Sequence, residues 1–281
     1  MAGDHGSPAA GGAHAWRCPD LGGLELFRAT HSEFTFRPHA HEEFFIALTE
    51  SGRAAPTYGG DRHLVGPGDL IVMNPEEPHA GGPPPGVSWT YRALYPSGQL
   101  MRQVAAELGP GGPRAPWFAP AVVRDPRATA LLLRFHRLSQ LPDRDTLQRE
   151  ACLVAGLTLL SGRHAARSGP PRSPGREPRG VRLAAEFLLE HSGEEVTLRD
   201  LARLTGLTPY HLCRVFRQAT GLTPHAFQIQ ARVRHARALL LAGCPIAQVA
   251  AEAGFCDQAH LTRHFKAITG LSPARYLACL G

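Results

Sequence analysis

The chain has 281 residues, enough for two domains. Its hydrophobic content of 43% is ordinary for a globular protein, and no apolar run approaches the ~20 residues that cross a membrane. The N-terminus lacks the apolar segment of a signal peptide, so we expect a cytoplasmic protein with no membrane partner. The net charge of +6 favours an acidic partner. The six cysteines form no C-x-x-C pair, which argues against a zinc finger or a disulfide framework and favours free thiols.

The N-terminal half is predicted to begin with a disordered segment and to continue as short strands. Residues 1–19 start with a run rich in glycine and alanine, and we expect them to be disordered. Over residues 24–95, apolar and polar residues alternate as in half-buried strands. Gly59-Gly60 is typical of a two-residue hairpin loop. Many short antiparallel strands at this spacing predict a small β-barrel or jelly roll.

Helical patterns follow the strands at about residues 99–108, 126–138 and 145–160. The last two are heavily apolar on one side. That apolar surface could pack on the barrel or form a dimer seam, and we favour packing for most of it. Residues 20–161 are therefore predicted to form one domain, an antiparallel barrel with flanking helices.

The second half of the chain is predicted to be a helical domain that follows a linker. Residues 162–180 are rich in proline, glycine and arginine, which is typical of a stiff, basic linker. Over residues 181–281 the pattern is that of seven helices. A Ser/Thr-Pro pair supplies an N-cap oxygen and a proline suited to the first helical turn. Three helix starts carry one: Thr208-Pro209, Thr223-Pro224 and Ser272-Pro273. Asp257 can cap a fourth helix in the same way.

The same sequence pattern occurs twice in the last third of the chain. Residues 206–227 align with residues 254–276, and the alignment pairs Arg214 with Arg263. A glycine, a short cap, a helix with arginines and a second glycine are typical of a helix-turn-helix. Two such units joined by one long helix can enter two successive turns of the major groove. The sequence therefore predicts an α+β protein of two domains whose C-terminal, all-α domain binds double-stranded DNA.

Each repeat has one helix face suited to DNA. Leu212 and Phe216, like Leu261 and Phe265, are expected to face the core. Arginine forms two hydrogen bonds with guanine, glutamine does so with adenine, and a small apolar side chain can contact a thymine methyl. The expected base contacts are Tyr210, Cys213, Arg214, Gln258, Ala259 and Arg263. The expected phosphate contacts are Arg217, Thr262 and Lys266. The alternative, a solvated face with internal ion pairs, fits a duplicated arginine pattern less well.

A group of histidines lies in the strand region. His39 and His41 would point the same way on one strand, and His79 could join them from a neighbouring strand. Three imidazoles arranged in this way suit zinc, nickel or iron. We favour the alternative that they line a pocket for an organic molecule and that the protein needs no cofactor. The candidate pocket residues are His39, His41, Glu43, His79, Trp89 and Tyr91.

The segments GFCDQAHLTRHFKAITGLSPARY and ALLLAGCPIAQVAAEAGF resemble the signature of the AraC/XylS family of bacterial transcriptional regulators. The resemblance covers residues 180–281 and implies two recognition helices in adjacent major-groove segments. Residues 20–95 resemble the cupin-like sensor domain of such regulators, which implies a small-molecule effector. Ala259 and Cys256 depart from the family pattern. Metal-binding cupins also carry a glutamate shortly after the H-x-H pair, and Phe45 or Ile46 stands there in this chain.

The resemblance implies a transcriptional regulator controlled by an effector in the barrel. It further implies a homodimer formed through residues 20–161, RNA polymerase as a partner, activation as the commoner mode, and no enzymatic activity. One alternative is a metal-dependent cupin enzyme or a metal sensor fused to a DNA-binding module. Another is a nucleoid-like DNA binder that needs no effector.

Overall fold

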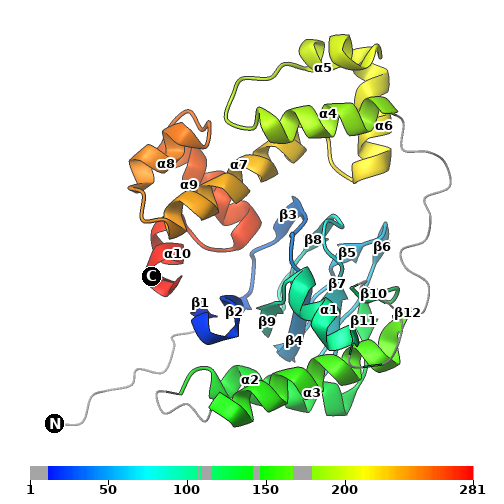
Figure 1. Cartoon of the computed structure of the whole chain (residues 1–281), viewed down its shortest axis with the longest axis vertical. Helices are drawn as coiled ribbons and strands as arrows, with labels where there is room; N and C mark the ends of the chain where they lie inside the picture. Colours follow the sequence, from blue (N-terminus) through cyan, green and yellow to red (C-terminus); the bar gives the residue numbers. More distant parts are fainter. Residues whose placement is uncertain (1–11, 107, 109–114, 142–145, 167–178, 281) are drawn as a thin grey trace.

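The structure is a computed structural model and describes residues 12–106, 108, 115–141, 146–166 and 179–280. A mainly β domain precedes a helical domain, so the predicted two-domain α+β fold is confirmed (Figure 1). The strands are β1 (Ala13–Cys18), β2 (Leu24–His31), β3 (Phe36–His39), β4 (Phe45–Gly52), β5 (Thr57–Tyr58), β6 (Asp61–Arg62), β7 (Leu70–Met73), β8 (His79–Gly81), β9 (Trp89–Tyr95), β10 (Trp117–Phe118), β11 (Val122–Val123) and β12 (Ala165–Ala166). The helices are α1 (Gly98–Ala106), α2 (Pro126–Leu138), α3 (Thr146–His164), α4 (Arg179–Glu190), α5 (Leu198–Thr205), α6 (Pro209–Thr220), α7 (Pro224–Leu241), α8 (Ile246–Glu252), α9 (Gln258–Thr269) and α10 (Pro273–Leu280).

Two antiparallel sheets form the body of the N-terminal domain. One has the strand order β1-β2-β9-β4-β7-β11 and the other β3-β8-β5-β6. The two sheets share a core, in which Phe45 and Ile71 of the larger sheet join the same apolar cluster as Tyr58 of the smaller one. The expected hairpin at Gly59-Gly60 links β5 to β6, and both glycines have the left-handed backbone that such a loop requires.

The larger sheet is buried on both faces because helices cover its outer side. Ile46 and Leu48 of β4 point away from the space between the sheets and join a cluster with Leu132, Leu153 and Leu157 of helices α2 and α3. Figure 1 shows these two helices lying together across one side of the domain. For these leucines the favoured interpretation, packing on the barrel, is confirmed.

The ends of two expected segments differ from the structure. The disorder expected for residues 1–19 is wrong for residues 13–18, which pair with β2 as strand β1, while residues 1–11 lie outside the described residues. The expected linker at 162–180 is shorter at both ends, because α3 continues to His164 and α4 begins at Arg179. Residues 165–166 also pair with β10, and residues 167–178 lie outside the described residues.

The C-terminal domain contains helices α4 to α10, the seven that the sequence predicts. The predicted caps are present: Thr208, Thr223 and Asp257 each accept a hydrogen bond from a backbone N–H in the first turn of the helix that follows. Helices α6 and α9 both end at a glycine with a left-handed backbone, Gly221 and Gly270. The two repeats therefore fold alike.

Helix α7 joins the two halves of this domain. Figure 1 shows α4–α6 at one end of α7 and α8–α10 at the other. Its apolar face is buried, with Val233 at 1% and Ala236 at 0% exposure. The second half of the domain also meets the barrel, because α10 contacts β1 and α9 contacts β3.

All six cysteines are free in the structure, as expected. In the part of the chain that the structure describes, no helix is both long enough and apolar enough to cross a bilayer.

His136 of α2 is buried between the helix and the larger sheet. Its Nε2 donates to the carbonyl oxygens of Phe27 and Ala93, each at 3.2 Å, and its Nδ1 accepts from Arg92 Nη1 at 3.0 Å. A second ring proton would face the Arg92 cation. Burial, and next the Arg92 charge, lower the pKa of His136 to about 3.

We expect His136 to make the protein less stable in mild acid. The unfolded chain binds a proton below the ordinary histidine pKa of about 6.5, whereas the folded protein does not bind one at this site until near pH 3. The free energy of unfolding should therefore fall between pH 7 and pH 5, by about 2 kcal/mol for this group. Urea unfolding of the wild type and of His136→Gln at both pH values tests this. The variant should be less stable at pH 7 and lose less on acidification, and equal losses would contradict the prediction.

Candidate functional site

Helices α6 and α9 present equivalent faces outward. Leu212 and Phe216 of α6 and Leu261 and Phe265 of α9 are all 0% exposed, as predicted. Because these side chains hold one face of each helix against the core, the opposite face is left to the solvent. The predicted DNA contacts lie along those opposite faces.

The predicted DNA contacts are exposed to different extents. The exposed residues are Arg214, Arg217, Gln258, Ala259, Arg263 and Lys266. Cys213 and Thr262 are half-buried, and the side chain of Tyr210 lies outside the described residues. Among the described residues, neither these arginines nor Lys266 form an ion pair. Their charges remain available to an anionic partner.

Two histidines brace the starts of these helices. His211 Nδ1 accepts a hydrogen bond from Arg214 Nη2 at 3.2 Å, which holds that arginine over the first turn of α6. His260 Nδ1 accepts from the backbone N–H of Cys256 at 3.4 Å. Both histidines therefore support the local structure of the exposed face.

A cavity of about 40 Å³ lies between the two sheets of the barrel. Trp89 and Tyr91, which the sequence assigned to a pocket, line it as a stacked pair with ring centroids 3.9 Å apart. Most of the other walls are apolar or aromatic and come from β3, β4, β7, β8 and β9. Ile268 of α9 also lines the cavity, so the helical domain forms part of its wall.

Three histidines meet at this cavity, as the sequence predicted. One ring nitrogen of each of His39, His41 and His79 lies within 4.8 Å of the others. His39 of β3 and His79 of β8 are direct cross-strand partners. The expectation that His39 and His41 share a strand is wrong, because β3 ends at His39 and His41 comes from the connection to β4.

Hydrogen bonds determine the tautomer of two of these histidines. His39 Nδ1 lies 2.7 Å from the carbonyl oxygen of Arg37, and His79 Nδ1 lies 3.0 Å from that of Glu77. A carbonyl only accepts, so both Nδ1 atoms carry the hydrogen and both Nε2 atoms keep a lone pair.

All three imidazoles are neutral at pH 7. Burial lowers the pKa of His39 to about 4 and that of His79 to about 3. Burial and the neighbouring His39 and His79 hold the pKa of His41 well below its ordinary value.

Glu43, the remaining predicted pocket residue, stands apart from the histidine cluster. Within the described ranges the cluster contains only histidines, and Glu43 Oε2 is buried without a hydrogen-bond partner. Phe45 and Ile46, where metal-binding cupins have a glutamate, are buried in β4. The cluster thus supplies three nitrogen donors and no carboxylate.

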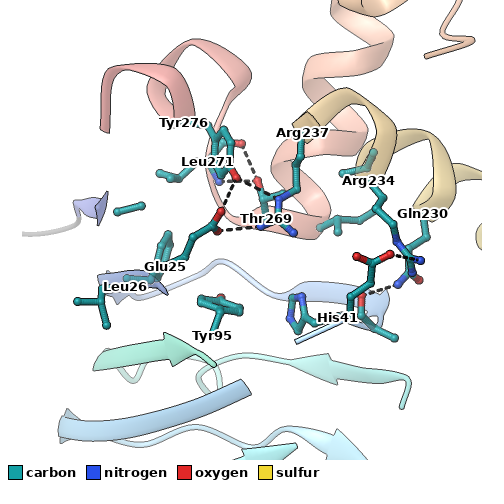
Figure 2. Close-up of a pocket in the computed structure, with 16 residues that line it drawn as sticks. Glu25, Leu26, His41, Tyr95, Gln230, Arg234, Arg237, Thr269, Leu271 and Tyr276 are labelled. Atoms are coloured by element: carbon teal, nitrogen blue, oxygen red, sulfur yellow. Dashed lines mark hydrogen bonds and ion pairs between the residues drawn. The ribbon is translucent and has the colours of Figure 1, made fainter. Parts of the chain in front are cut away.

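A second cavity, of about 60 Å³, lies where the two domains meet (Figure 2). Arg237 of α7 donates from Nη2 to Glu25 Oε2 at 2.8 Å and from Nε to Tyr276 Oη at 3.1 Å. Tyr276 Oη in turn donates to Glu25 Oε1 at 3.1 Å. Burial alone would lower the pKa of Arg237, but Glu25 and Tyr276 raise it above its ordinary value, so the group stays charged. These bonds join α7 and α10 to β2.

Further polar contacts cross the same boundary. Arg234 Nη1 lies 2.6 Å from Glu42 Oε1, and the amide of Gln230 donates to the carbonyl of Ala40. Sequence reasoning missed these contacts. The sequence contains one signal of them, two arginines three residues apart beside the buried face of α7, but nothing in it identifies partners in another domain.

The ends of both recognition helices touch the barrel domain beside the histidine cavity. A Cβ atom built on Gly221 would lie 2.7 Å from Pro78 Cγ, and one built on Gly270 would lie 3.2 Å from Phe36 Cε1. Pro78 directly precedes His79, and the ring of Phe36 stacks on His39 at 5.7 Å. The end of α6 is therefore separated from His79 by one residue, and the end of α9 is separated from His39 by one aromatic ring.

Comparison with known proteins identifies both domains. Residues 21–156 match the AraC-like ligand binding domain, and residues 201–278 match a helix-turn-helix domain. The chain is 30% identical over 239 residues to the transcriptional regulator YbfI of Bacillus subtilis, covering 85% of this chain and 86% of that protein. It is 26% identical to the arabinose operon regulatory protein of Salmonella typhimurium, with 87% of each chain covered.

The fold is also similar to that of solved structures. ToxT from Vibrio cholerae superposes with a TM-score of 0.57 at 10% identity, over 92% of this chain and 98% of that one. Another ToxT structure, with a TM-score of 0.55, 11% identity and coverage of 92% and 95%, contains a bound unsaturated fatty acid. With its ligand-binding domain, its helix-turn-helix domain and relatives aligned along most of its length, this chain belongs to the AraC family of transcriptional regulators.

Proposed function

We propose that this regulator is switched by a small molecule that binds in the barrel cavity and changes the placement of the DNA-reading helices. One observation carries the proposal: Ile268 of α9 lines both the barrel cavity and the cavity between the domains. A recognition helix is thus part of the wall of the effector site. A molecule bound there touches both domains at once.

The small volume of the cavity couples the binding of an effector to a movement of α9. One water occupies roughly 10–15 Å³ on this measure, so about 40 Å³ holds on the order of three waters. A larger effector fits only when Ile268 and its helix move outward, and it therefore binds the rearranged protein more tightly. Such a difference in affinity is what a ligand needs in order to shift a conformational equilibrium.

An effector with a largely apolar body suits this cavity best. Its walls include Trp89, Tyr91 and Phe45, which favour apolar groups. The fatty acid bound to ToxT supports the capacity of this fold to hold such a molecule. The proposed effector-contact residues are His39, His41, Glu43, His79, Trp89 and Tyr91.

We place DNA along the exposed faces of α6 and α9. Exposure and the absence of ion pairs among the described residues support Arg214 and Arg263 as base contacts, and Gln258 and Ala259 are exposed beside Arg263. Tyr210 and Cys213 complete the proposed set of base contacts. Arg217, Thr262 and Lys266 lie further along the helices, where phosphates are expected.

The regulator is proposed to act in the cytoplasm as an activator that works with RNA polymerase. We assign it no catalytic role. A metal-dependent cupin enzyme is the weaker alternative, because the position of its carboxylate ligand holds Phe45 or Ile46. A DNA binder without an effector is weaker still, since it would have no use for a cavity lined in part by a recognition helix.

We further propose that the regulator is a homodimer formed through α3. Leu147 is 77% exposed and Val154 45% exposed, and Ala151 lies exposed between them on the same helical face. An apolar stripe of this kind on a helix that otherwise packs inward suits a second copy of the same helix.

Arg263→Ala should cost about 1–3 kcal/mol of binding free energy at the selected DNA site and relax the preference at one base pair. Lys266→Ala should weaken binding to all sequences alike and lower the salt slope by roughly one, because a phosphate contact carries no sequence information. Sites selected from random DNA, followed by anisotropy titrations at several salt concentrations, measure both effects. Arg134→Ala, which removes an exposed arginine from α2, is the control. Equal losses on selected and random DNA in the Arg263 variant would refute its role in base reading.

A compound that raises the thermal stability of the protein by binding in the cavity should change its DNA affinity, typically by about 5–150-fold. DNA must then change the affinity for the compound by the same factor. Trp89→Leu should weaken compound binding and leave DNA affinity in the absence of compound unchanged. Compounds that bind in the cavity without altering DNA affinity would show that the coupling is wrong.

Leu147→Glu and Val154→Glu should each convert a dimer into a monomer, because a buried, unpaired carboxylate opposes association. Sedimentation equilibrium measures the change in mass. Leu64→Glu alters another exposed leucine, 62% exposed and not part of α3, and should leave the dimer intact. A wild type that stays monomeric at micromolar concentration would exclude this interface.

A further inference from the structure

The histidine cluster has the features of a metal centre. His39, His41 and His79 come from two neighbouring strands and the connection after the first, and their ring centroids lie 4.4 to 4.9 Å apart. Three imidazoles crowded together in a mainly apolar cavity are an uncommon arrangement for side chains that only fill space. They supply three nitrogen donors on one side of a small cavity.

The hydrogen bonds around the cluster orient its donors. Arg37 and Glu77 accept the Nδ1 hydrogens of His39 and His79 through their backbone carbonyls. This arrangement recurs at metal sites, where such a bond holds the ring in place and leaves Nε2 to bind the ion. The hydrogen bonds of these two rings to described residues run through Nδ1, and no described side chain donates to either Nε2 atom. Both lone pairs therefore lack a partner among the described side chains.

We propose that His39, His41 and His79 bind one divalent first-row transition ion, whose open coordination positions hold an anionic effector. The binding of an effector to the ion rests on the proposed function, which assigns the effector to this cavity. Three imidazoles suit zinc, cobalt, nickel or iron(II). Among the described residues no further side chain joins the set, which leaves at least one position open, as in the three-histidine sites that bind an exogenous ligand.

The geometry needs only a small adjustment. Nitrogens bound to one tetrahedral ion at ~2.0–2.1 Å lie about 3.3 Å from one another. In this structure the three donor atoms lie within 4.8 Å of one another. Small rotations of the side chains close that difference.

The charge of the site indicates the chemical class of its ligand. The three imidazoles are neutral ligands and the cluster holds no carboxylate, so the bound ion keeps its charge of about +2. An anion with an oxygen or nitrogen donor is therefore favoured at the open position. The stacked Trp89 and Tyr91 pair offers an apolar surface to the rest of that molecule. A small carboxylate or phenolate on an apolar body fits both features.

The experiment uses untagged full-length protein that is stripped with a chelator and titrated with Co²⁺, whose visible absorption reports its coordination. The wild type should bind one equivalent and develop the absorption of a low-coordinate nitrogen site. His39→Ala and His79→Ala should lower Co²⁺ affinity by more than about a hundredfold. His235→Ala, which removes an exposed histidine of α7, should not alter it. His79→Gln, which keeps a polar side chain of similar size, replaces the alanine variant if that variant does not fold.

Azide, a small anion that fits the cavity, then tests the open position. Saturable changes in the Co²⁺ spectrum on adding azide are expected. Failure of the wild type to bind Co²⁺, or equal binding by the triad variants, would overturn the metal site. Binding of Co²⁺ without any response to azide would overturn the open position.

The same preparations separate this inference from the proposed function. DNA binding is measured by anisotropy on each metal-free and Co²⁺-loaded sample. Sequence-specific DNA binding without Co²⁺ binding would refute the metal site alone. Co²⁺ binding at the triad without sequence-specific DNA binding would refute the proposed function and leave the metal site standing.

Discussion

A charged group that is removed from water must keep a partner of opposite charge, and Arg237 meets this requirement across a domain boundary. The side chains of Arg237 and Glu25 are only 22% and 15% exposed. Breaking such a pair by removing one partner typically costs about 3–5 kcal/mol, far more than a surface pair contributes. Separation of the domains must therefore rehydrate both groups. Helix α7, which carries Arg237, also holds the two helix-turn-helix units together, so one helix joins both units to the barrel.

Apolar packing ties the two helix-turn-helix units to the barrel to different extents. The second helix-turn-helix unit shares a continuous cluster with the barrel, in which Phe265 and Leu271 join Phe27 and Tyr91. The first unit has a separate core built around Val181 and Phe216. The second unit therefore moves with the barrel unless apolar area is exposed, whereas the first is tied to it mainly through α7 and the contact at Pro78. Any rearrangement at the domain boundary changes the relation between the two units.

Local signals in the sequence were sufficient for the helical domain. The three histidines do converge as predicted, but the strand that His39 and His41 were expected to share is not present. The capping oxygens of Thr208 and Asp257 and the buried leucine of each repeat act within one or two helical turns, so their pattern is legible in a single sequence. Strand β1 was missed because its stability comes from pairing with β2 and from the helical domain rather than from its own composition. The contacts of Arg234 and Arg237 were missed for a related reason. Their partners are distant in the chain, and only the assembled fold brings them together.

The glycines that end the two recognition helices restrict the substitutions that the chain tolerates there. At Gly221 there is no room for a methyl group, because a Cβ atom would lie 2.7 Å from the ring of Pro78, which cannot swing aside as a flexible side chain would. The positive φ of 71° adds a backbone cost for any other residue. A side chain at this position would work as a permanent spacer, holding the first reading helix away from the barrel whether or not a ligand is present. Under the proposed switch, constitutive behaviour therefore lies one substitution away from regulated behaviour, at a residue that lines neither of the two cavities.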